Sequence, residues 1–202
     1  SIETIAALEN LAAFFLQPTA EPSFLSTTEA QGNLQEIKVL LSEAEQQGIF
    51  QLDVLASPTL KLAALLHDIG KPVTYALNEA GNITFYHHPQ AGVPLAQQVT
   101  RRLNMKIQDR RLVQQVVAHH MRPGQLSHDE ITERAIRRYF VDLGPIGIHV
   151  GLISLADHLA MRGPDVLTDH WNRHLATVRL LLTRYIRERD RILPPRLIQG
   201  EE

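Results

Sequence analysis

The chain has 202 residues, and with 44% hydrophobic residues it can bury a good core in one or two domains. It contains no cysteine, which excludes disulfides and thiolate metal sites. The net charge is only −2, and because there is no run of about eighteen apolar residues and no cationic leader, we expect a cytoplasmic protein without a membrane segment.

The first elements are predicted to be a helix, a linker and a second helix. Apolar residues recur at helical spacing between Ile5 and Leu16, and Pro18 stops that helix. Residues 17–33 are rich in Pro, Ser, Thr and Gly, which is typical of a linker. The next helix is expected at residues 34–47.

The most informative segment is the helix predicted at residues 59–70, because it ends in His67 and Asp68 followed by Gly-Lys-Pro. A charged aspartate next to a buried helix is costly unless something pairs with it, and a divalent metal is the obvious partner. Histidine and aspartate are both ligands for such ions. The alternative is an ordinary helix C-terminus, with a histidine near the dipole and Gly-Lys-Pro as its exit.

The remaining chain is predicted to be helical apart from one hairpin. Residues 73–86 alternate around a Glu-Ala-Gly-Asn turn, which predicts a short β-hairpin. Ser127 and Glu130 have the spacing of a capping box. The expected fold class is therefore all-α, a helical bundle with a possible hairpin insert. Its further helices are expected at residues 89–103, 107–121, 129–140, 145–162 and 168–190.

Metal-competent side chains interrupt three later apolar segments as well. The pair His87-His88 opens a helix at Pro89, the pair His119-His120 ends another helix, and Asp157 lies inside a third. One such residue is usually a satisfied polar group of the core. Four such places in one small chain without cysteine favour a common site with nitrogen and oxygen ligands.

The sequence motifs around these residues resemble those of the HD superfamily of metal-dependent phosphohydrolases. LAALLHDIGKP, GNITFYHHPQAG, VVAHHMRPG and LADHLAMRG are similar to the HD half of bacterial CCA-adding enzymes and poly(A) polymerases, as is the tail LPPRLIQG. The resemblance covers about residues 59–200 and implies an HD-domain bundle that binds a divalent metal ion, whether Mg, Mn, Ni, Fe or Zn.

Carried over residue by residue, the resemblance implies a set of five metal ligands. They are His67, Asp68, His88, His120 and Asp157. Neighbouring residues on a helix point about 100° apart, so His87 and His119 are given supporting or surface roles.

The chain departs from the superfamily upstream of the HD pair. The superfamily usually has another histidine on an earlier helix, whereas residues 1–66 contain none. Around that position the chain offers Asn33, Gln35 and Glu36, and an amide is a poorer ligand than an imidazole. This departure favours an alternative function, a non-catalytic RNA-binding body with a structural or decayed metal site.

The activity that the resemblance implies is metal-dependent hydrolysis of nucleotide or RNA phosphoesters. Asp68 is the expected catalytic ligand, placed to bridge two ions if two are bound. Lys71 is expected either to hold a phosphate oxygen or, equally well, to cap the helix C-terminus. Arg122 is a second candidate for binding phosphate. No Asp-x-Asp clamp follows a Gly-Ser pair, so a nucleotidyltransferase head is expected to be missing from this chain.

Charge is unevenly spread along the chain. Residues 1–66 hold two basic and eight acidic residues (net −6), and the remainder holds 18 basic and 14 acidic residues (net +4). Basic stripes that include Arg101, Arg102 and Arg110 predict an RNA-binding surface, and solvated helix faces are the alternative.

The expected organisation has three parts. They are an N-terminal helix and linker at 1–33, an HD domain at 34–165, and a C-terminal helix with a tail at 166–202. Both ends look cut, so we expect a fragment of a protein similar to a tRNA nucleotidyltransferase or poly(A) polymerase.

Overall fold

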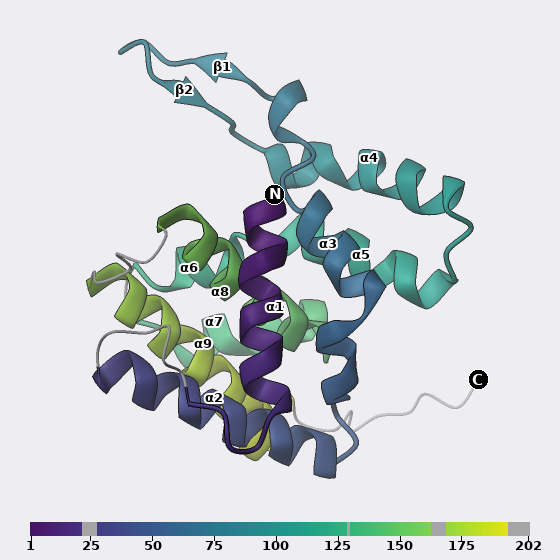
Figure 1. Ribbon diagram of the computed structural model, residues 1–202. Helices are drawn as coiled ribbons and strands as arrows, with labels where there is room; N and C mark the ends of the chain where they lie inside the picture. Colours follow the sequence, from purple (N-terminus) through teal and green to yellow (C-terminus); the bar gives the residue numbers. More distant parts are fainter. Residues whose placement is uncertain (22–27, 129, 163–168, 194–202) are drawn as a thin grey trace, which may run out of the picture.

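The computed structural model describes residues 1–21, 28–128, 130–162 and 169–193, which form a helical bundle with one small hairpin (Figure 1). The all-α prediction is confirmed. The α-helices are α1 (Ile2–Leu16), α2 (Thr28–Gln46), α3 (Pro58–Leu66), α4 (His88–Arg102), α5 (Ile107–His119), α6 (Arg122–Leu126), α7 (Glu133–Leu143), α8 (Ile146–Arg162), α9 (Asp169–Arg187) and α10 (Arg189–Ile192). Two 3₁₀ helices, Leu52–Ala56 and Lys71–Val73, flank α3.

The core is built around α8, which is apolar on nearly all sides. Val150, Ile153 and Leu155 of this helix are fully buried. α1 packs along α8, and α5 and α9 pack against its other faces (Figure 1). A helix without a polar face is stable in water only when neighbours cover it on every side. Among the described residues no single helix is long and apolar enough to span a membrane, and α7 and α8 pass that test only together, across a 107° bend.

The end of α1 is fixed by a buried lysine of α2. The Nζ atom of Lys38 donates to the carbonyl oxygens of Gln17, Pro18 and Ala20 at 2.6, 3.2 and 3.2 Å. The last carbonyls of a helix have no partner within the helix, and a buried ammonium group needs several acceptors. The contact therefore satisfies both groups and ties the two N-terminal helices together.

The linker predicted at 17–33 is too long, because α2 already begins at Thr28. Its first turn carries Ala30, which is buried, and the helix accommodates Gly32 in its interior. The Ser, Thr and Gly content of this stretch is typical of a loop, but burial of one face decides the conformation. Residues 22–27 lie outside the described part of the chain.

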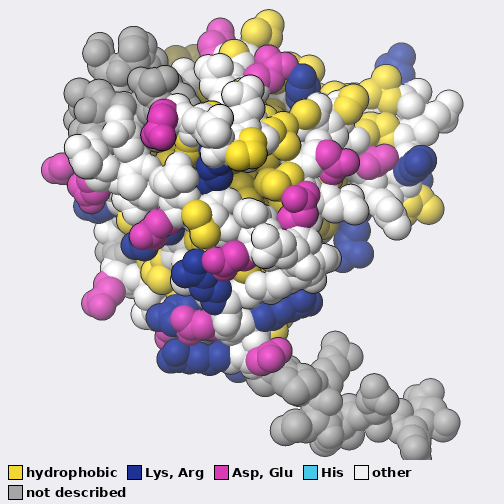
Figure 2. All heavy atoms as spheres, turned by 60° about the horizontal axis from the view of Figure 1, so that its bottom comes forward, with side chains coloured by type: hydrophobic (Ala, Val, Ile, Leu, Met, Phe, Trp, Pro, Cys, Tyr) yellow, Lys and Arg dark blue, Asp and Glu magenta, His cyan; other side chains and the backbone are white. Residues whose placement is uncertain are grey.

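α2 covers α9 and is joined to it by ion pairs. Glu43 accepts two hydrogen bonds from the Arg187 guanidinium group, at 2.7 and 2.8 Å, and Glu36 pairs with Arg179 at 2.5 Å. Figure 2 shows Lys and Arg side chains gathered on the lower part of this face, with Asp and Glu side chains among them. Much of the positive charge of α9 is therefore neutralised by acidic residues of the N-terminal region.

The capping box predicted at Ser127 and Glu130 is wrong. Ser127 follows the short helix α6, which was not predicted, and its hydroxyl donates to the Gly124 carbonyl at 2.7 Å. The next helix, α7, begins at Glu133 rather than 129, and its N-cap is Thr132, whose hydroxyl accepts from the Ala135 amide at 3.2 Å. Two residues with capping side chains lie close together here, and the spacing pattern selected the wrong one.

The helix predicted at 59–70 ends earlier, at Leu66, and residues 67–70 form turns. This turn lies against the start of α4 at Gly70. A Cβ atom on Gly70 would be 2.0 Å from the His88 carbonyl oxygen and 2.7 Å from the Gly92 amide nitrogen. Only glycine allows so close an approach of two backbones. The contact sets the position of the His67-Asp68 pair relative to His88.

The predicted hairpin is confirmed, although its strands are short. β1 (Ala76–Leu77) and β2 (Ile83–Thr84) are antiparallel, with Ala76 opposite Thr84 and Leu77 opposite Ile83. The hairpin projects from the body of the bundle between α3 and α4 (Figure 1).

Candidate metal centre

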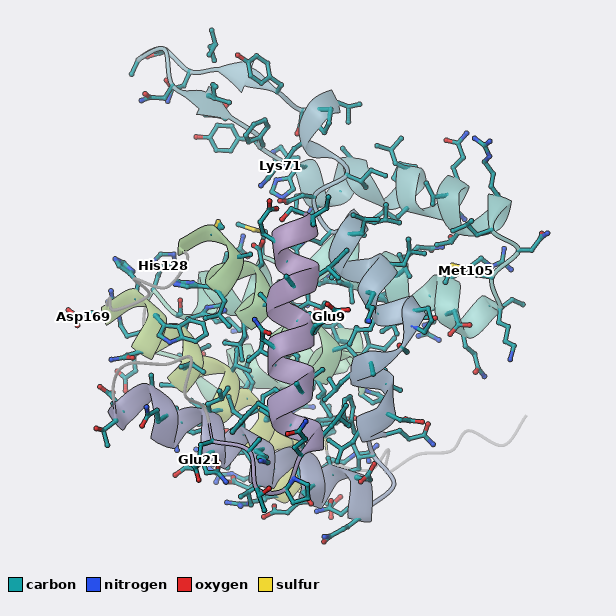
Figure 3. The ribbon with its side chains drawn as sticks, viewed as in Figure 1. Glu9, Glu21, Lys71, Met105, His128 and Asp169 are labelled. Atoms are coloured by element: carbon teal, nitrogen blue, oxygen red, sulfur yellow. The ribbon has the colours of Figure 1, made fainter. Side chains whose placement is uncertain are left out.

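Five side chains from four parts of the fold meet at one point. His67 and Asp68 come from the turn after α3, His88 from the first turn of α4, His120 from the end of α5, and Asp157 from the middle of α8. Lys71 marks this region in Figure 3, at the base of the hairpin and above the N-terminal end of α1. The structure thus brings together the five residues that the resemblance implies, whose ligand roles stay predictions.

The two oxygens of Asp68 face different neighbours. Oδ2 lies 3.1 Å from Nε2 of His67, which is also 3.1 Å from Oδ1 of Asp157. Oδ1 of Asp68 lies 3.2 Å from Nε2 of His88 and 3.5 Å from Nε2 of His120. The two last imidazoles approach each other with their Nε2 atoms 3.2 Å apart. Asp68 therefore stands between two groups of donors, as a bridging carboxylate would.

All three imidazoles are held in the same way. Nδ1 of His67 lies 2.7 Å from the Ala64 carbonyl oxygen, and Nδ1 of His120 lies 3.0 Å from that of Val117. Nδ1 of His88 makes the same contact with the carbonyl three residues earlier, at 2.9 Å. A carbonyl can only accept, so each Nδ1 carries a proton, and each Nε2 is the nitrogen that faces the centre. This is how proteins commonly orient histidine ligands.

The donor set fits a divalent metal ion. Two donors bound to one ion at about 2.1 Å, at right angles to each other, lie about 3 Å apart. The distances around His67 and Asp68 match this value, and ligand atoms of His67, Asp68 and His120 all lie within 4.8 Å of one another. Among the described residues, Nε2 of His67 is buried without a hydrogen-bond partner. Because this nitrogen faces two carboxylate oxygens, either a proton on it or a metal ion between them has to offset the repulsion.

The electrostatics of the centre favour a positive charge at this position, either a proton or a metal ion. Burial alone would lower the pKa of His67, but the carboxylates of Asp157 and Asp68 raise it to about 9. Burial would raise the pKa of Asp68, and the neighbouring His120, His67 and Lys71 together hold it far below its usual range. Without a metal ion the centre therefore holds a proton on His67 at neutral pH, and a divalent ion would compete for that position.

Two residues outside the five contact the carboxylates. The ammonium group of Lys71 donates to Oδ2 of Asp68 at 2.6 Å. The hydroxyl of Thr4, in the first turn of α1, donates to Oδ1 of Asp157 at 3.4 Å. Sequence reasoning did not find Thr4, because no pattern within the first helix distinguishes a threonine that faces α8 from one that faces solvent. Lys71 is a partner of Asp68 here rather than a cap of α3.

The upstream helix α2 does not reach the centre. Asn33, Gln35 and Glu36 belong to α2, which packs on α9, and Glu36 pairs with Arg179 at the surface. The N-terminal element that approaches the centre is α1, through Thr4. Of the three α2 residues that stand in place of the missing histidine, Glu36 therefore pairs with Arg179 rather than with the centre.

His87 and His119, which precede His88 and His120 in the sequence, are not among the converging side chains. His87 is exposed at the N-cap of α4 with a left-handed backbone (φ 62°). His119 is half-buried and lines a separate cavity with Arg122. Arg122 donates to Asp142 of α7 at 3.0 Å and lies over the Tyr139 ring. Among the described residues no contact joins it to the five converging side chains.

A cavity of about 300 Å³ opens beside the centre, between α6, α8 and α9. His120 and Asp157 form part of its wall, and Met121, Ser154 and Met161 line it further out. It offers both polar atoms and apolar surface close to the converging donors, which suits a small ligand.

The arginines predicted to bind RNA lie away from the centre. Arg101 and Arg102 are exposed in the last turn of α4, and Arg110 is half-exposed in the first turns of α5. His88 begins the same helix, so α4 separates Arg101 from the centre by about 20 Å. Met105 marks this far end of the α4–α5 pair in Figure 3.

Comparison with known proteins agrees with the geometry. Residues 40–162, which contain all five converging residues, match the HD domain family. The chain is also 32% identical over 145 residues to an A-adding tRNA nucleotidyltransferase of Deinococcus radiodurans. That match covers 71% of this chain and 32% of the relative, so the chain spans about a third of the relative's length. Since the family match extends over more than half of its length, the chain belongs to the HD domain family.

Proposed function

We propose that the chain is a metal-dependent phosphohydrolase that acts on nucleotide or RNA phosphoesters. The observation that carries the proposal is the convergence of three imidazole Nε2 atoms and two carboxylates at separations of 3.1–3.5 Å. A divalent ion bound there supplies an activated water near neutral pH and neutralises phosphate charge. Proteins of the HD domain family are in general metal-dependent hydrolases, which supports this assignment.

The chain's own residues would divide the remaining tasks. The three carbonyl-anchored histidines and the two aspartates hold the ion, and Asp68 faces both groups of donors. Lys71 is the cation nearest to Asp68 and is partly exposed, so it can exchange its carboxylate contact for a phosphate oxygen of the substrate. The cavity beside His120 and Asp157 would receive the rest of the ester.

Asp68→Ala is the direct test, because it removes the carboxylate that contacts all three imidazoles of the centre. We expect elemental analysis of the parent chain to find about one or two equivalents of divalent metal, and the variant to lose most of it. Hydrolysis of bis(p-nitrophenyl) phosphate with added Mn²⁺ should fall to background. The variant should stay folded, since the buried apolar residues of α3 and α5 are untouched. Full activity in Asp68→Ala would overturn the proposal.

A second candidate function is the RNA-binding body of a larger tRNA-processing protein. The relative's name as an A-adding tRNA nucleotidyltransferase and the exposed Arg101, Arg102 and Arg110 favour it. In that case a head domain with the polymerising site lies outside this chain. If the parent chain binds RNA but hydrolyses no ester, RNA binding is the one candidate function that remains. If it does both, the two functions coexist.

A further inference from the structure

A second cavity lies on the other side of the His119-His120 pair. It measures about 580 Å³ and is formed by the end of α5, by α6 and by α7. His120 faces the candidate metal centre, and His119 lines this cavity together with Arg122, Arg134 and Arg138. Three arginines therefore line a cavity whose wall includes His119, the neighbour in sequence of the candidate metal ligand His120.

The arginines are arranged for an anion rather than for one another. Arg134 and Arg138 are spaced i, i+4 on α7, so two like charges stand one above the other on a helix face, which is unfavourable without a counter-ion. In the described ranges no carboxylate lies within 4.0 Å of either guanidinium group. Among the described residues that line the cavity, Asp142 is the one acidic residue, and it is already paired with Arg122.

Arg122 is fixed in place before any ligand arrives. Its guanidinium group is held by Asp142 at 3.0 Å and by the Tyr139 ring at 5.2 Å, and only 21% of its side chain is exposed. One carboxylate contact uses a small part of the five N–H donors of a guanidinium group. The remaining donors can form the paired hydrogen bonds that arginine makes with phosphate oxygens.

We propose that Arg122, Arg134 and Arg138 form a phosphate-binding pocket for the backbone of an RNA strand whose scissile ester lies at the metal centre. This inference rests on the proposed function, because it assigns a substrate class to the same site. The strand would pass over the His119-His120 corner, with one phosphate at the metal centre and a neighbouring one between the arginines. A mononucleotide is too short to occupy both.

Arg134→Glu combined with Arg138→Glu tests the pocket, since both side chains are exposed and neither contacts the core. Binding of a fluorescein-labelled single-stranded 12-mer RNA to the full chain is measured in EDTA, so that no hydrolysis occurs. We expect the dissociation constant to rise at least tenfold and the slope of log K against log salt to fall by about one to two.

Arg173→Glu combined with Arg189→Glu is the matched control. Both residues are exposed on α9 and α10, outside the cavity, and the change in net charge is the same. The control should change RNA affinity less than threefold. Equal losses in the two double variants would mean that only net charge matters, and would overturn the pocket.

Hydrolysis separates the failure of the pocket from the failure of the proposed activity. Bis(p-nitrophenyl) phosphate does not extend beyond the metal centre, so the pocket variant should hydrolyse it within twofold of the parent rate. If the pocket variant loses RNA binding but the parent chain hydrolyses no phosphoester, the pocket is supported and the proposed hydrolase activity is refuted. RNA hydrolysis with unchanged KM in the pocket variant would remove the pocket and leave the hydrolase.

Discussion

At the scale of single residues, Asp68 contacts most of the other groups of the centre. Its two oxygens contact three imidazoles and one ammonium group, although the residue lies in a turn rather than in a helix. The two oxygens of a carboxylate point in different directions, so this one side chain contacts His67 with one oxygen and His88 with the other. His67 lies in the same turn, and Lys71 directly follows it. Residues 67–71 therefore determine much of the centre.

Replacing Lys71 with Met distinguishes binding of the substrate phosphate from a purely structural contact with Asp68. If the ammonium group binds the substrate phosphate, Lys71→Met should lower kcat/KM for a phosphoester about 10- to 100-fold, the range of one charge-assisted hydrogen bond. Metal content should stay that of the parent chain, because Lys71 donates no ligand atom. Lys71→Arg, which keeps the charge, should recover part of the loss. Unchanged kinetics in Lys71→Met would limit the residue to a structural contact with Asp68.

His174 is expected to make stability depend on acid. It is buried on α9, where Nε2 lies 3.1 Å from the Ser154 hydroxyl, and burial together with nearby His158 lowers its pKa from 6.5 to about 4. Its neutral form therefore contributes stability that is complete above pH 6.5 and is lost as the pH falls toward 4. Between pH 7.5 and pH 5 the loss is about 2 kcal/mol.

His174→Gln removes this titration and keeps a hydrogen-bonding group for Ser154. Urea unfolding at the two pH values should show the variant losing about 2 kcal/mol less than the parent chain over the same interval. Comparing the two proteins removes the opposite contribution of His67, whose pKa is raised. Equal losses in both proteins would contradict the burial of a neutral imidazole at this position.

At the scale of the elements, the register between the HD turn and α4 depends on glycine. Gly70 touches the backbone of His88, and Gly92 lies one turn further on, where a Cβ would be 2.9 Å from Val117. α3, α4 and α5 can pack this closely only because these two positions have no side chain. The separation between His67, His88 and His120 is therefore set by backbone contact rather than by the ligands themselves.

Gly70→Ala should damage both the fold and the centre. The added methyl group would lie 2.0 Å from the His88 carbonyl oxygen, so one backbone has to move, at a cost of about 1–3 kcal/mol in the free energy of unfolding. Metal affinity should fall with it. Gly32→Ala is the control, because a Cβ there meets no atom within 4 Å and lies inside α2.

The control should become more stable by about 0.5–1 kcal/mol, as alanine is favoured over glycine within a helix. Chemical denaturation followed by circular dichroism measures both variants. A neutral effect of Gly70→Ala would show that the turn and α4 are free to separate.

Sequence patterns predicted the elements better than their ends. The helical periodicity of α1, α8 and α9 was sufficient because one or more of their faces is strongly apolar. The start of α2 was misplaced because its Ser, Thr and Gly content is typical of a loop, and the cap of α7 was misplaced because Thr132 and the nearby Ser127 are both good capping residues. The short helix α6 was too brief to give a periodic signal.

The centre was predictable for a different reason. An apolar helix seldom buries a polar side chain that has no partner. The family resemblance gave the order of five such residues, His67, Asp68, His88, His120 and Asp157. Thr4 was not predictable, and neither was the grouping of Arg134 and Arg138 with Arg122, itself a candidate for binding phosphate, because these positions result from packing between elements that are distant in sequence. The position of Glu36 could not be read from the sequence for the same reason, since its helix packs on α9.

At the scale of the whole molecule, positive charge is distributed over separate surfaces. Of the arginines of α9, Arg179 and Arg187 are paired with acids of α2, whereas Arg101, Arg102 and Arg110 form no ion pair within the described residues. Arg101 and Arg102 lie in the last turn of α4 and Arg110 in the first turns of α5, at the end of this helix pair that Met105 marks in Figure 3. An RNA molecule that reached both regions would have to extend along the α4–α5 pair.

The triple variant Arg101→Glu, Arg102→Glu and Arg110→Glu should weaken RNA binding without affecting the centre. If each arginine contacts one phosphate, the salt slope for single-stranded RNA should fall by about two. Metal content by elemental analysis should equal that of the parent chain, because the nearest candidate ligand is about 15 Å from Arg110 along α5 and about 20 Å from Arg101 along α4. An unchanged affinity at every salt concentration would mean that these arginines are only a solvated helix face.

The anchoring of the histidines has a consequence for how the centre should be perturbed. Ala64 and Val117 lie in the last turns of α3 and α5, where carbonyl groups have no partner within the helix, so His67 and His120 are C-terminal caps as well as candidate ligands. Replacing either histidine with alanine should let a helix end fray even in metal-free protein. Asp68 caps neither helix, and its loss should therefore report on the metal with the least disturbance of the scaffold.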